Sequence, residues 1–202
     1  RYNARVLFHQ IAEAAWECAD PGIQFSTTIN KWHTASNTGP INASNPCSEY
    51  LHLDNSACNL ASLNLLAFLD SERDDRFDLD GFRQAVRVVF TAQDILVGNA
   101  DYPTPAIAQT SRDFRQLGLG YTNLGAMLMA LGLPYNSEPA RAWAAAVTAL
   151  MTGEAYATSV DLAQRVDEFA GYSSNSDPMR QVLQLHREAL DSVSEVAPED
   201  LI

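Results

Sequence analysis

The residues best placed to do chemistry together lie between Ile41 and Leu65, a segment that holds two of the three cysteines of the chain. Cys47 has an amide two residues before it, Asn45, and a carboxylate two residues after it, Glu49. Pro46 disfavours a helix here, and in an extended backbone residues two apart project to the same face. The segment is therefore predicted to offer one ligand a sulfur to react, an acid or base, and an amide to orient a substrate.

The second cysteine of this segment, Cys58, follows Cys47 by eleven residues. A straight strand of that length would separate the two by roughly 35 Å. If both sulfurs serve one substrate, the chain must double back, and the turn signal Asp54-Asn55 between two apolar runs is where we expect the reversal. Residues 57–65 are then predicted to form a buried strand or the entry to one.

Composition limits the class of protein. The chain has 202 residues, of which 47% are hydrophobic, and a net charge of −12. This charge argues against a nucleic-acid partner, although helix N-termini can still bind the phosphates of a nucleotide. No apolar run reaches about 18 residues and no signal peptide is recognisable, so no membrane association is expected. Three cysteines outside an even framework predict a reducing compartment, the cytoplasm, and reactive sulfur.

The elements around this segment are mostly predicted to be helices. Apolar spacing and capping residues favour helices over 3–19, 81–97, 123–131, 137–166 and 179–193, and a short strand over 23–29. Cys18 lies on the apolar stripe of the first helix and is expected to be a buried core residue. Asp80 is expected to cap the second helix, whose predicted inner stripe is Phe82, Val86, Val89, Phe90 and Ile95.

The remaining segments are predicted to be loops. Residues 31–40 and the charged run 71–80 are expected to be polar loops, and the acidic end after residue 193 is expected to fray. Gly118, Gly120 and Gly125 do not have the dinucleotide-binding spacing, so we expect them at close-packing and turn positions. No repeat or internal domain boundary is visible, and residues 1–202 are predicted to be a single segment with its loop at about 41–56.

Two motifs resemble a known family. NPCSE (residues 45–49) resembles the finger-loop motif of ribonucleotide reductases, and ACNLASLNL (57–65) resembles the strand that follows, with the second cysteine at the expected spacing. RQLGLGYTNLGAML (115–128) resembles another signature of the same catalytic subunits. The similarity extends to about Tyr172 and is strongest to the coenzyme-B12-dependent class II enzymes. It implies an α/β fold: part of the reductase α/β barrel with a central finger loop, helix-rich in this segment.

The resemblance also implies roles for the residues of this loop in reducing ribonucleotides to deoxyribonucleotides for DNA synthesis. Cys47 would carry a thiyl radical that abstracts the 3′ hydrogen, and a buried apolar site would keep it a thiol beforehand. Glu49 would accept the 3′-hydroxyl proton, and Asn45 would hold the ribose hydroxyls. Cys58 would deliver reducing equivalents and end in a disulfide bond. The implied substrate-binding residues are Ser44, Asn45, Pro46, Cys47, Ser48 and Glu49.

The resemblance further implies adenosylcobalamin as the cofactor, bound mainly by residues outside this chain, and no metal site. The implied partners are a ribonucleotide substrate, a thioredoxin-like or dithiol reductant, nucleotide effectors bound elsewhere, and a second copy in a homodimer. The family's catalytic subunits are much longer than this chain, and the partner cysteine expected upstream has no clear counterpart. The chain is therefore expected to be a fragment that is inactive alone.

Other interpretations of the same residues are open. Cys47 and Cys58 could be plain core cysteines, or could join His33 and His52 in a zinc site, although no closely spaced cysteine pair supports that. The chain could belong to another reductase class with a separate radical-generating subunit. It could also be a non-catalytic helical part of such an enzyme.

Overall fold

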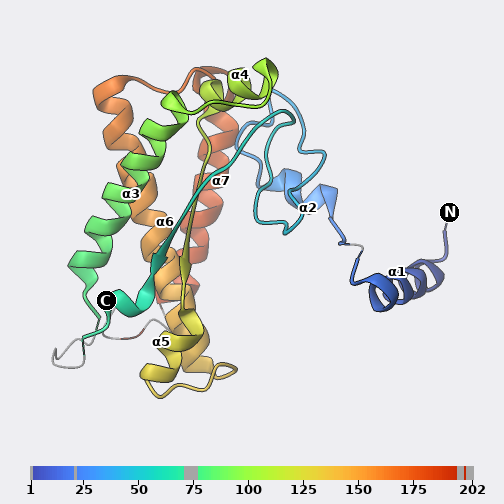
Figure 1. The fold of residues 1–202 in the computed structure, drawn as a ribbon, viewed down its shortest axis with the longest axis vertical. Helices are drawn as coiled ribbons and strands as arrows, with labels where there is room; N and C mark the ends of the chain where they lie inside the picture. Colours follow the sequence, from blue (N-terminus) through green and yellow to red (C-terminus); the bar gives the residue numbers. More distant parts are fainter. Residues whose placement is uncertain (1, 21, 71–76, 195–197, 199–202) are drawn as a thin grey trace.

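A computed structural model describes residues 2–20, 22–70, 77–194 and 198 of the chain. Long helices and a pair of strands form the main body, and the first helix is set apart from it (Figure 1). The elements in chain order are α1 (Ala4–Cys18), α2 (Ser26–Lys31), β1 (Asn59–Asn64), a 3-10 helix (Leu65–Phe68), α3 (Leu79–Asn99), α4 (Pro105–Phe114), β2 (Leu117–Thr122), α5 (Leu124–Ala130), α6 (Glu138–Val166) and α7 (Tyr172–Ser194).

The two strands run parallel. Their register pairs Asn59 with Leu117 at one end and Asn64 with Thr122 at the other. Parallel neighbours need a long crossover connection, and here α3 and α4 lie within it. α3 contacts both strands and packs along α6, which in turn contacts α7. The helices therefore form a layer beside the strand pair, as the bundle of long ribbons in Figure 1 shows.

The strand predicted over residues 57–65 is confirmed as β1, but its burial was only partly predicted. Leu63 is buried, whereas Leu60 is 62% exposed. Successive strand residues point to opposite faces, and in the described chain the helix layer covers the face to which Leu63 points. Gly118 and Gly120 lie within β2, a strand that the sequence analysis missed, rather than in a turn.

The core forms where the helix layer meets the ends of the strands. Rings of four aromatic residues pack tilted or edge-on with centroids 5.1 to 6.2 Å apart, which is the preferred geometry for such pairs. Across the α3–α6 contact, the buried carboxylate of Glu154 accepts hydrogen bonds from Arg83 (2.8 Å) and Arg87. The aromatic residues are Phe68, Phe77, Phe82 and Trp143.

Most predicted helices are confirmed, with one cap and one buried stripe corrected. α3 is capped by Asp78, whose side chain accepts from the Gly81 backbone at 3.2 Å, and not by Asp80. Ile95 is exposed, and Gln93 is buried in α3 instead. Residues 71–76 of the predicted charged loop lie outside the described residues, as does most of the predicted frayed end. The described part of that predicted loop differs from the prediction, because Phe77 is fully buried and α3 already begins at Leu79.

Two segments differ from their predicted structure. The strand predicted over residues 23–29 is wrong, because Ser26–Lys31 is helical. α7 begins at Tyr172, so Pro178 lies inside a helix rather than before it. A proline cannot donate to the carbonyl four residues earlier, which here is that of Ser174. The side chain of Asn37 donates to this carbonyl at 2.9 Å and so replaces the missing bond.

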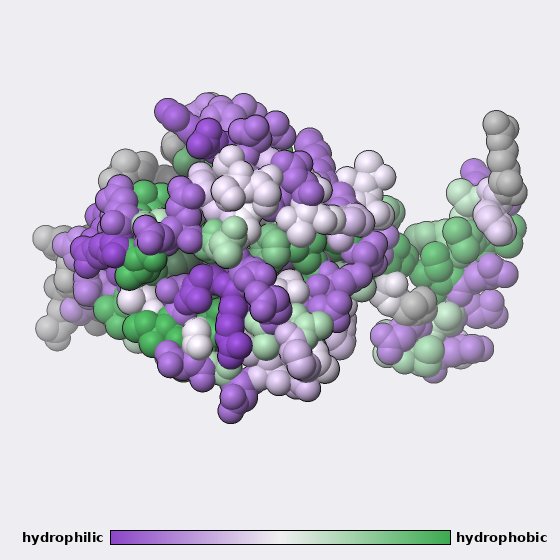
Figure 2. All heavy atoms as spheres, turned by 90° about the horizontal axis from the view of Figure 1, so that it is seen from above, coloured by the Kyte–Doolittle hydropathy of each residue, from purple (hydrophilic) through white to green (hydrophobic). Residues whose placement is uncertain are grey.

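The helix predicted over residues 3–19 is confirmed as α1, but its apolar stripe is not buried. Every residue of α1 is exposed or half-buried, and Cys18 is exposed, with its thiol 3.1 Å from the Ala14 carbonyl oxygen. Apolar residues of α1 therefore lie on the surface, where Figure 2 shows them as a green area at the end of the molecule. Within the described ranges, none of the helices combines the length and apolar character that crossing a membrane requires.

Candidate active site at the finger loop

The loop between α2 and β1 is folded back on itself and tied at both ends. At its start, the side chain of Asn30 accepts from the Ile41 backbone N–H (2.9 Å) and donates to the Ile41 carbonyl (3.1 Å). Further along, the Asn42 amide donates to the Asp54 carboxylate at 2.9 Å and joins the two legs of the loop. The chain bends at Asp54 and Asn55, which has a φ of 55°. The predicted reversal is thus confirmed.

The tip of the loop is a tight turn rather than the predicted extended segment. The Ser48 N–H donates to the Asn45 carbonyl at 3.1 Å, and Ser48 has a φ of 66°. Tyr50 closes the turn, because its N–H donates to the Asn45 side-chain oxygen at 2.9 Å and its carbonyl accepts from the Asn45 N–H at 3.3 Å. The prediction that Cys47 and Glu49 share one extended face with Asn45 is therefore wrong.

The turn leaves the thiol of Cys47 exposed, so the predicted burial of this sulfur is also wrong for the described chain. Pro46 beside it is exposed as well. The two serines that flank the tip are joined through Gln24, whose side-chain nitrogen donates to the hydroxyls of Ser44 (3.2 Å) and Ser48. The bonds that shape the tip are thus made within the loop itself and by Gln24, which lies 20 and 24 residues before the two serines, and the sulfur is open to an approaching molecule.

Cys58 lies immediately before β1 and is half-buried. Burial raises the pKa of its thiol, and the negative charge of Glu49 raises that pKa further. The finger loop therefore brings the Glu49 carboxylate into electrostatic range of the second sulfur. Gly118 of β2 is paired with Leu60 but borders the Cys58 side chain, because an added Cβ at Gly118 would lie 2.6 Å from the sulfur. This glycine leaves the space that the thiol occupies.

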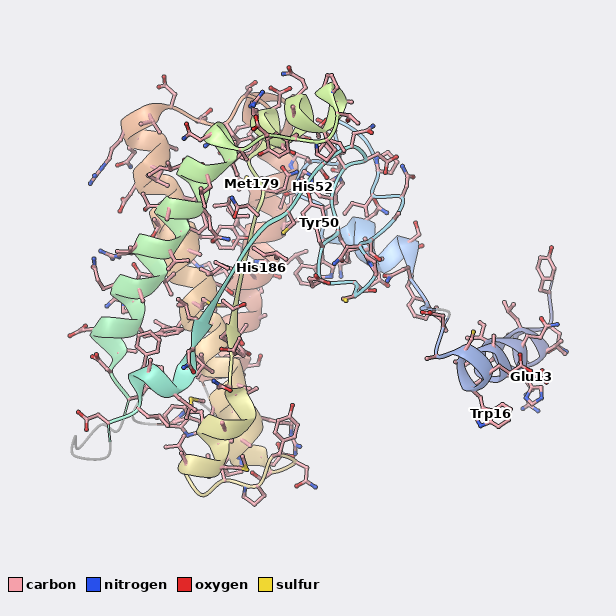
Figure 3. The ribbon with its side chains drawn as sticks, in the orientation of Figure 1. Glu13, Trp16, Tyr50, His52, Met179 and His186 are labelled. Carbon is pink, nitrogen blue, oxygen red and sulfur yellow. The ribbon has the colours of Figure 1, made fainter. Side chains whose placement is uncertain are left out.

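Tyr50 is a neighbour of this site that the sequence analysis did not single out. Its hydroxyl donates to the Ser56 hydroxyl at 2.7 Å. Burial raises the pKa of Tyr50, and the charge of an ionised Cys58 also raises it. In Figure 3, Tyr50 and His52 lie together beside the strand pair, and their rings stack with centroids 6.4 Å apart. An aromatic residue directly after Glu49 was the available signal.

Two histidines pack behind the loop. The ring of His33 is buried and contacts that of His52 edge-on at 5.5 Å, and its Nε2 lies 2.9 Å from the Gly39 carbonyl oxygen. Burial, and then the neighbouring His33, lower the pKa of His52 to about 4. In the described part of the chain, no group of three or more histidine, cysteine or acidic side chains could hold a metal ion. The alternative zinc site therefore has no support in the geometry.

The comparisons with known proteins agree with the motifs. Residues 1–198 match the family model described as ribonucleotide reductase, barrel domain. The vitamin B12-dependent ribonucleotide reductase of Rhodopirellula baltica is 53% identical over 99% of this chain, and that of Streptomyces clavuligerus is 52% identical over 94%. The vitamin B12-dependent ribonucleoside-diphosphate reductase of Mycobacterium tuberculosis is 34% identical over 87%. The chain spans 19%, 20% and 25% of the lengths of these three relatives.

A solved structure shows the same fold. The class Id ribonucleotide reductase alpha subunit of Actinobacillus ureae superposes with a TM-score of 0.68 and 20% identity. The superposition covers 84% of this chain and 33% of that subunit. The chain belongs to the ribonucleotide reductase barrel-domain family, and the predicted α/β class, helix-rich in this segment, is confirmed.

Proposed function

We propose that this member of the reductase barrel family supplies the sulfur chemistry of a vitamin B12-dependent ribonucleotide reductase, which converts ribonucleotides to deoxyribonucleotides for DNA synthesis. One observation carries the proposal. The finger loop presents the exposed thiol of Cys47 at its tip and places the Glu49 carboxylate within electrostatic range of the half-buried thiol of Cys58. Two sulfurs in different surroundings, with a carboxylate near one of them, suit a reaction that needs a radical carrier, a base and a reductant.

In this proposal Cys47 acts first, as a sulfur radical that takes the hydrogen atom from C3′ of the ribose. S–H and C–H bonds are close in strength, so the transfer is reversible. Glu49 accepts the proton of the 3′-hydroxyl as general base. The Asn45 side-chain oxygen is bound to the Tyr50 N–H, so its amide nitrogen is the group that we assign to the ribose hydroxyls. Ser44, Pro46 and Ser48 would complete the substrate contacts at the tip.

Cys58 acts next, together with a partner cysteine. The two thiols give up two hydrogen atoms and form a disulfide, the 2′-hydroxyl leaves as water, and a C–H bond forms at C2′. Cys47 then returns its hydrogen to C3′. The raised pKa of Cys58 keeps this sulfur protonated near neutral pH, which is the state that can donate hydrogen. A thioredoxin-like protein or a dithiol would reduce the disulfide by thiol exchange.

The cofactor that we propose is adenosylcobalamin, as the names of the relatives suggest. When bound, it supplies the radical that removes the hydrogen atom from a thiol. The exposed position of Cys47 at the loop tip fits this requirement, because a group held by other parts of the enzyme can reach the sulfur. We assign cofactor binding mainly to residues outside this chain. We also propose nucleotide effectors bound elsewhere, a homodimer, and a cytoplasmic location, where thiols stay reduced.

The proposal is tested by replacing each cysteine in turn in the full-length protein that contains this chain. Cys47→Ser should abolish both deoxynucleotide formation and hydrogen exchange between cofactor and solvent, because the O–H bond of serine is too strong for its hydrogen atom to be removed, and no radical forms at this position. Cys58→Ser should abolish the product but retain the exchange. Cys18→Ser is the matched control, since this exposed thiol on α1 lies outside the site, and it should leave both signals unchanged.

Two results would contradict the assignment. Deoxynucleotide formation by Cys47→Ser above a trace would remove Cys47 as the radical carrier. Many turnovers by Cys58→Ser with a dithiol reductant would make Cys58 a packing residue. Activity that needs no adenosylcobalamin would instead favour another reductase class.

A further inference from the structure

Two buried polar side chains hold the backbone on either side of Cys58. Ser111 of α4 is 1% exposed, and its hydroxyl accepts from the N–H of Ala57, the residue before Cys58, at 3.2 Å. Gln93 of α3 is 2% exposed, and its side-chain nitrogen donates to the carbonyl of Asn59, the residue after Cys58, at 2.8 Å. The backbone is thus fixed from two helices, immediately before and after the cysteine.

Gln93 also joins the two strands at the level of the cysteine. The same side-chain nitrogen donates to the Gly118 carbonyl at 2.9 Å, and the Asn59 side chain donates back to the Gln93 backbone carbonyl at 3.3 Å. Gly118 is the residue whose missing Cβ leaves room for the Cys58 sulfur. One amide therefore ties together the residue after the thiol and the residue that borders its space.

Polar residues at these positions run against the local pattern. Gln93 follows Phe82 and Val86 on the inner face of α3, where helical periodicity favours an apolar residue. Burying an amide or a hydroxyl is unfavourable unless hydrogen bonds compensate for the lost water. An apolar side chain would fill the same space without this penalty, but it would leave the carbonyls at the start of the strands without that donor. What these two residues contribute is the position of the backbone around Cys58.

We propose that Gln93 and Ser111 are positioning residues for the Cys58 thiol. The proposal deepens the proposed function, in which Cys58 alternates between a thiol and a disulfide. A disulfide forms only within a narrow range of geometry, with the two Cβ atoms about 3.5–4.5 Å apart. A backbone held on both sides returns the sulfur to the same place after each reduction, whereas a loosened one lets it turn toward solvent.

The test uses the full-length protein and measures the alkylation of each cysteine by mass spectrometry across a range of pH. Ser111→Ala and Gln93→Leu each remove one of the two ties, and Ser111→Thr keeps a hydroxyl at its position. Thr158→Val is the matched control, because Thr158 is also buried but bonds within α6, to the Glu154 carbonyl at 2.8 Å. This readout depends on the surroundings of each thiol and not on turnover.

Loosening should expose the Cys58 thiol and lower its pKa toward the ordinary value, because burial is the main cause of the raised pKa. Each unit of that decrease makes the thiolate about tenfold more abundant below the pKa. We therefore expect Ser111→Ala and Gln93→Leu to accelerate alkylation of Cys58 well beyond twofold at pH 7.5, with the rate at Cys47 unchanged. Ser111→Thr should restore the original rate.

The outcomes separate this inference from the proposed function. The positioning role is wrong if Cys58 is alkylated in both variants at a rate within twofold of that in the Thr158→Val control. It is also wrong if the alkylation of Cys47 accelerates as much as that of Cys58. If both variants accelerate the alkylation of Cys58 as expected while Cys58→Ser retains turnover, the positioning role of Gln93 and Ser111 stands and the reductant role of Cys58 fails. Acceleration together with lost deoxynucleotide formation, with the hydrogen exchange that depends on Cys47 retained, supports both.

Discussion

A single methyl group at Gly118 should displace the thiol of Cys58. The added Cβ would lie 2.6 Å from the Cys58 sulfur and 2.5 Å from the Leu60 side chain. Leu60 is mostly exposed and can swing aside at little cost. The Cys58 sulfur is bonded directly to its Cβ, so it can move away only by a full rotation about χ1, unless the strands separate. Overpacking of this kind typically costs about 1–3 kcal/mol, and we expect the lower half of that range because one of the two clashes is easily relieved.

Gly120 provides the matched control on the same strand. A Cβ there would meet the Ser62 hydroxyl at 3.7 Å, an ordinary contact, and neither glycine has a positive φ. Gly120→Ala should therefore keep or slightly raise the stability, by about 0.4–1 kcal/mol through the unfolded state. Urea unfolding measures both variants, and alkylation of Cys58 reports the position of the thiol. If Gly118→Ala matches Gly120→Ala in unfolding midpoint and in Cys58 labelling, the sulfur does not occupy the space beside Gly118.

Three further predictions concern the supports of the site. Because the pKa of His52 is about 4 in the folded chain and about 6.5 unfolded, protons bind the unfolded chain first as the pH falls. Stability should decrease by about 2–3 kcal/mol between pH 7 and 4.5 on this account, and His52→Phe should remove that slope in urea unfolding. An NMR titration of His52 with a midpoint above pH 6 would refute it. Glu154→Ala leaves two half-exposed arginines unpaired at the α3–α6 contact and should cost about 1–2 kcal/mol in urea, while Glu138→Ala, in an exposed pair, should change nothing. Asn175→Ala removes the buried bonds to the Asn37 N–H, the Thr38 hydroxyl and the Gly171 carbonyl and should lower the unfolding free energy by about 1–3 kcal/mol.

Much of the helical layer, and the bend of the finger loop at Asn55, could be predicted from the sequence because their signals are local. Ser137 caps α6 with its own side chain, and Asn55 takes the left-handed backbone that a turn requires. The segment 23–29 misled because short apolar runs rich in β-branched residues do not distinguish a strand from a helix. The start of α7 could not be predicted because Pro178 is tolerated only through Asn37, a residue 141 positions earlier in the chain.

At the site, the sequence predicted which residues lie at the tip but not the shape of the tip. The turn that exposes Cys47 depends on Tyr50 closing back on the Asn45 side chain, a bond that competes with the extended backbone. Gln93 lies 34 positions from its partner Asn59 in β1, and Ser111 lies 54 positions from its partner Ala57, just before β1. Periodicity carries no signal for such contacts, and at position 93 it predicts the wrong kind of residue.

The two cysteines differ in what holds them, and the difference matches the roles proposed for them. Cys47 lies on a turn whose bonds come from residues 24–50, so the tip can adjust to a substrate without disturbing the strands. Cys58 is flanked by bonds from α3 and α4 and faces β2, all distant in sequence. A radical carrier must be reached by both a cofactor and a sugar, which favours an exposed sulfur on an adjustable loop. A sulfur that forms and loses a disulfide in every turnover must meet its partner in one geometry each time, which favours an anchored strand. A protein in which each cysteine had the surroundings of the other would therefore fail in both steps, even with both thiols present.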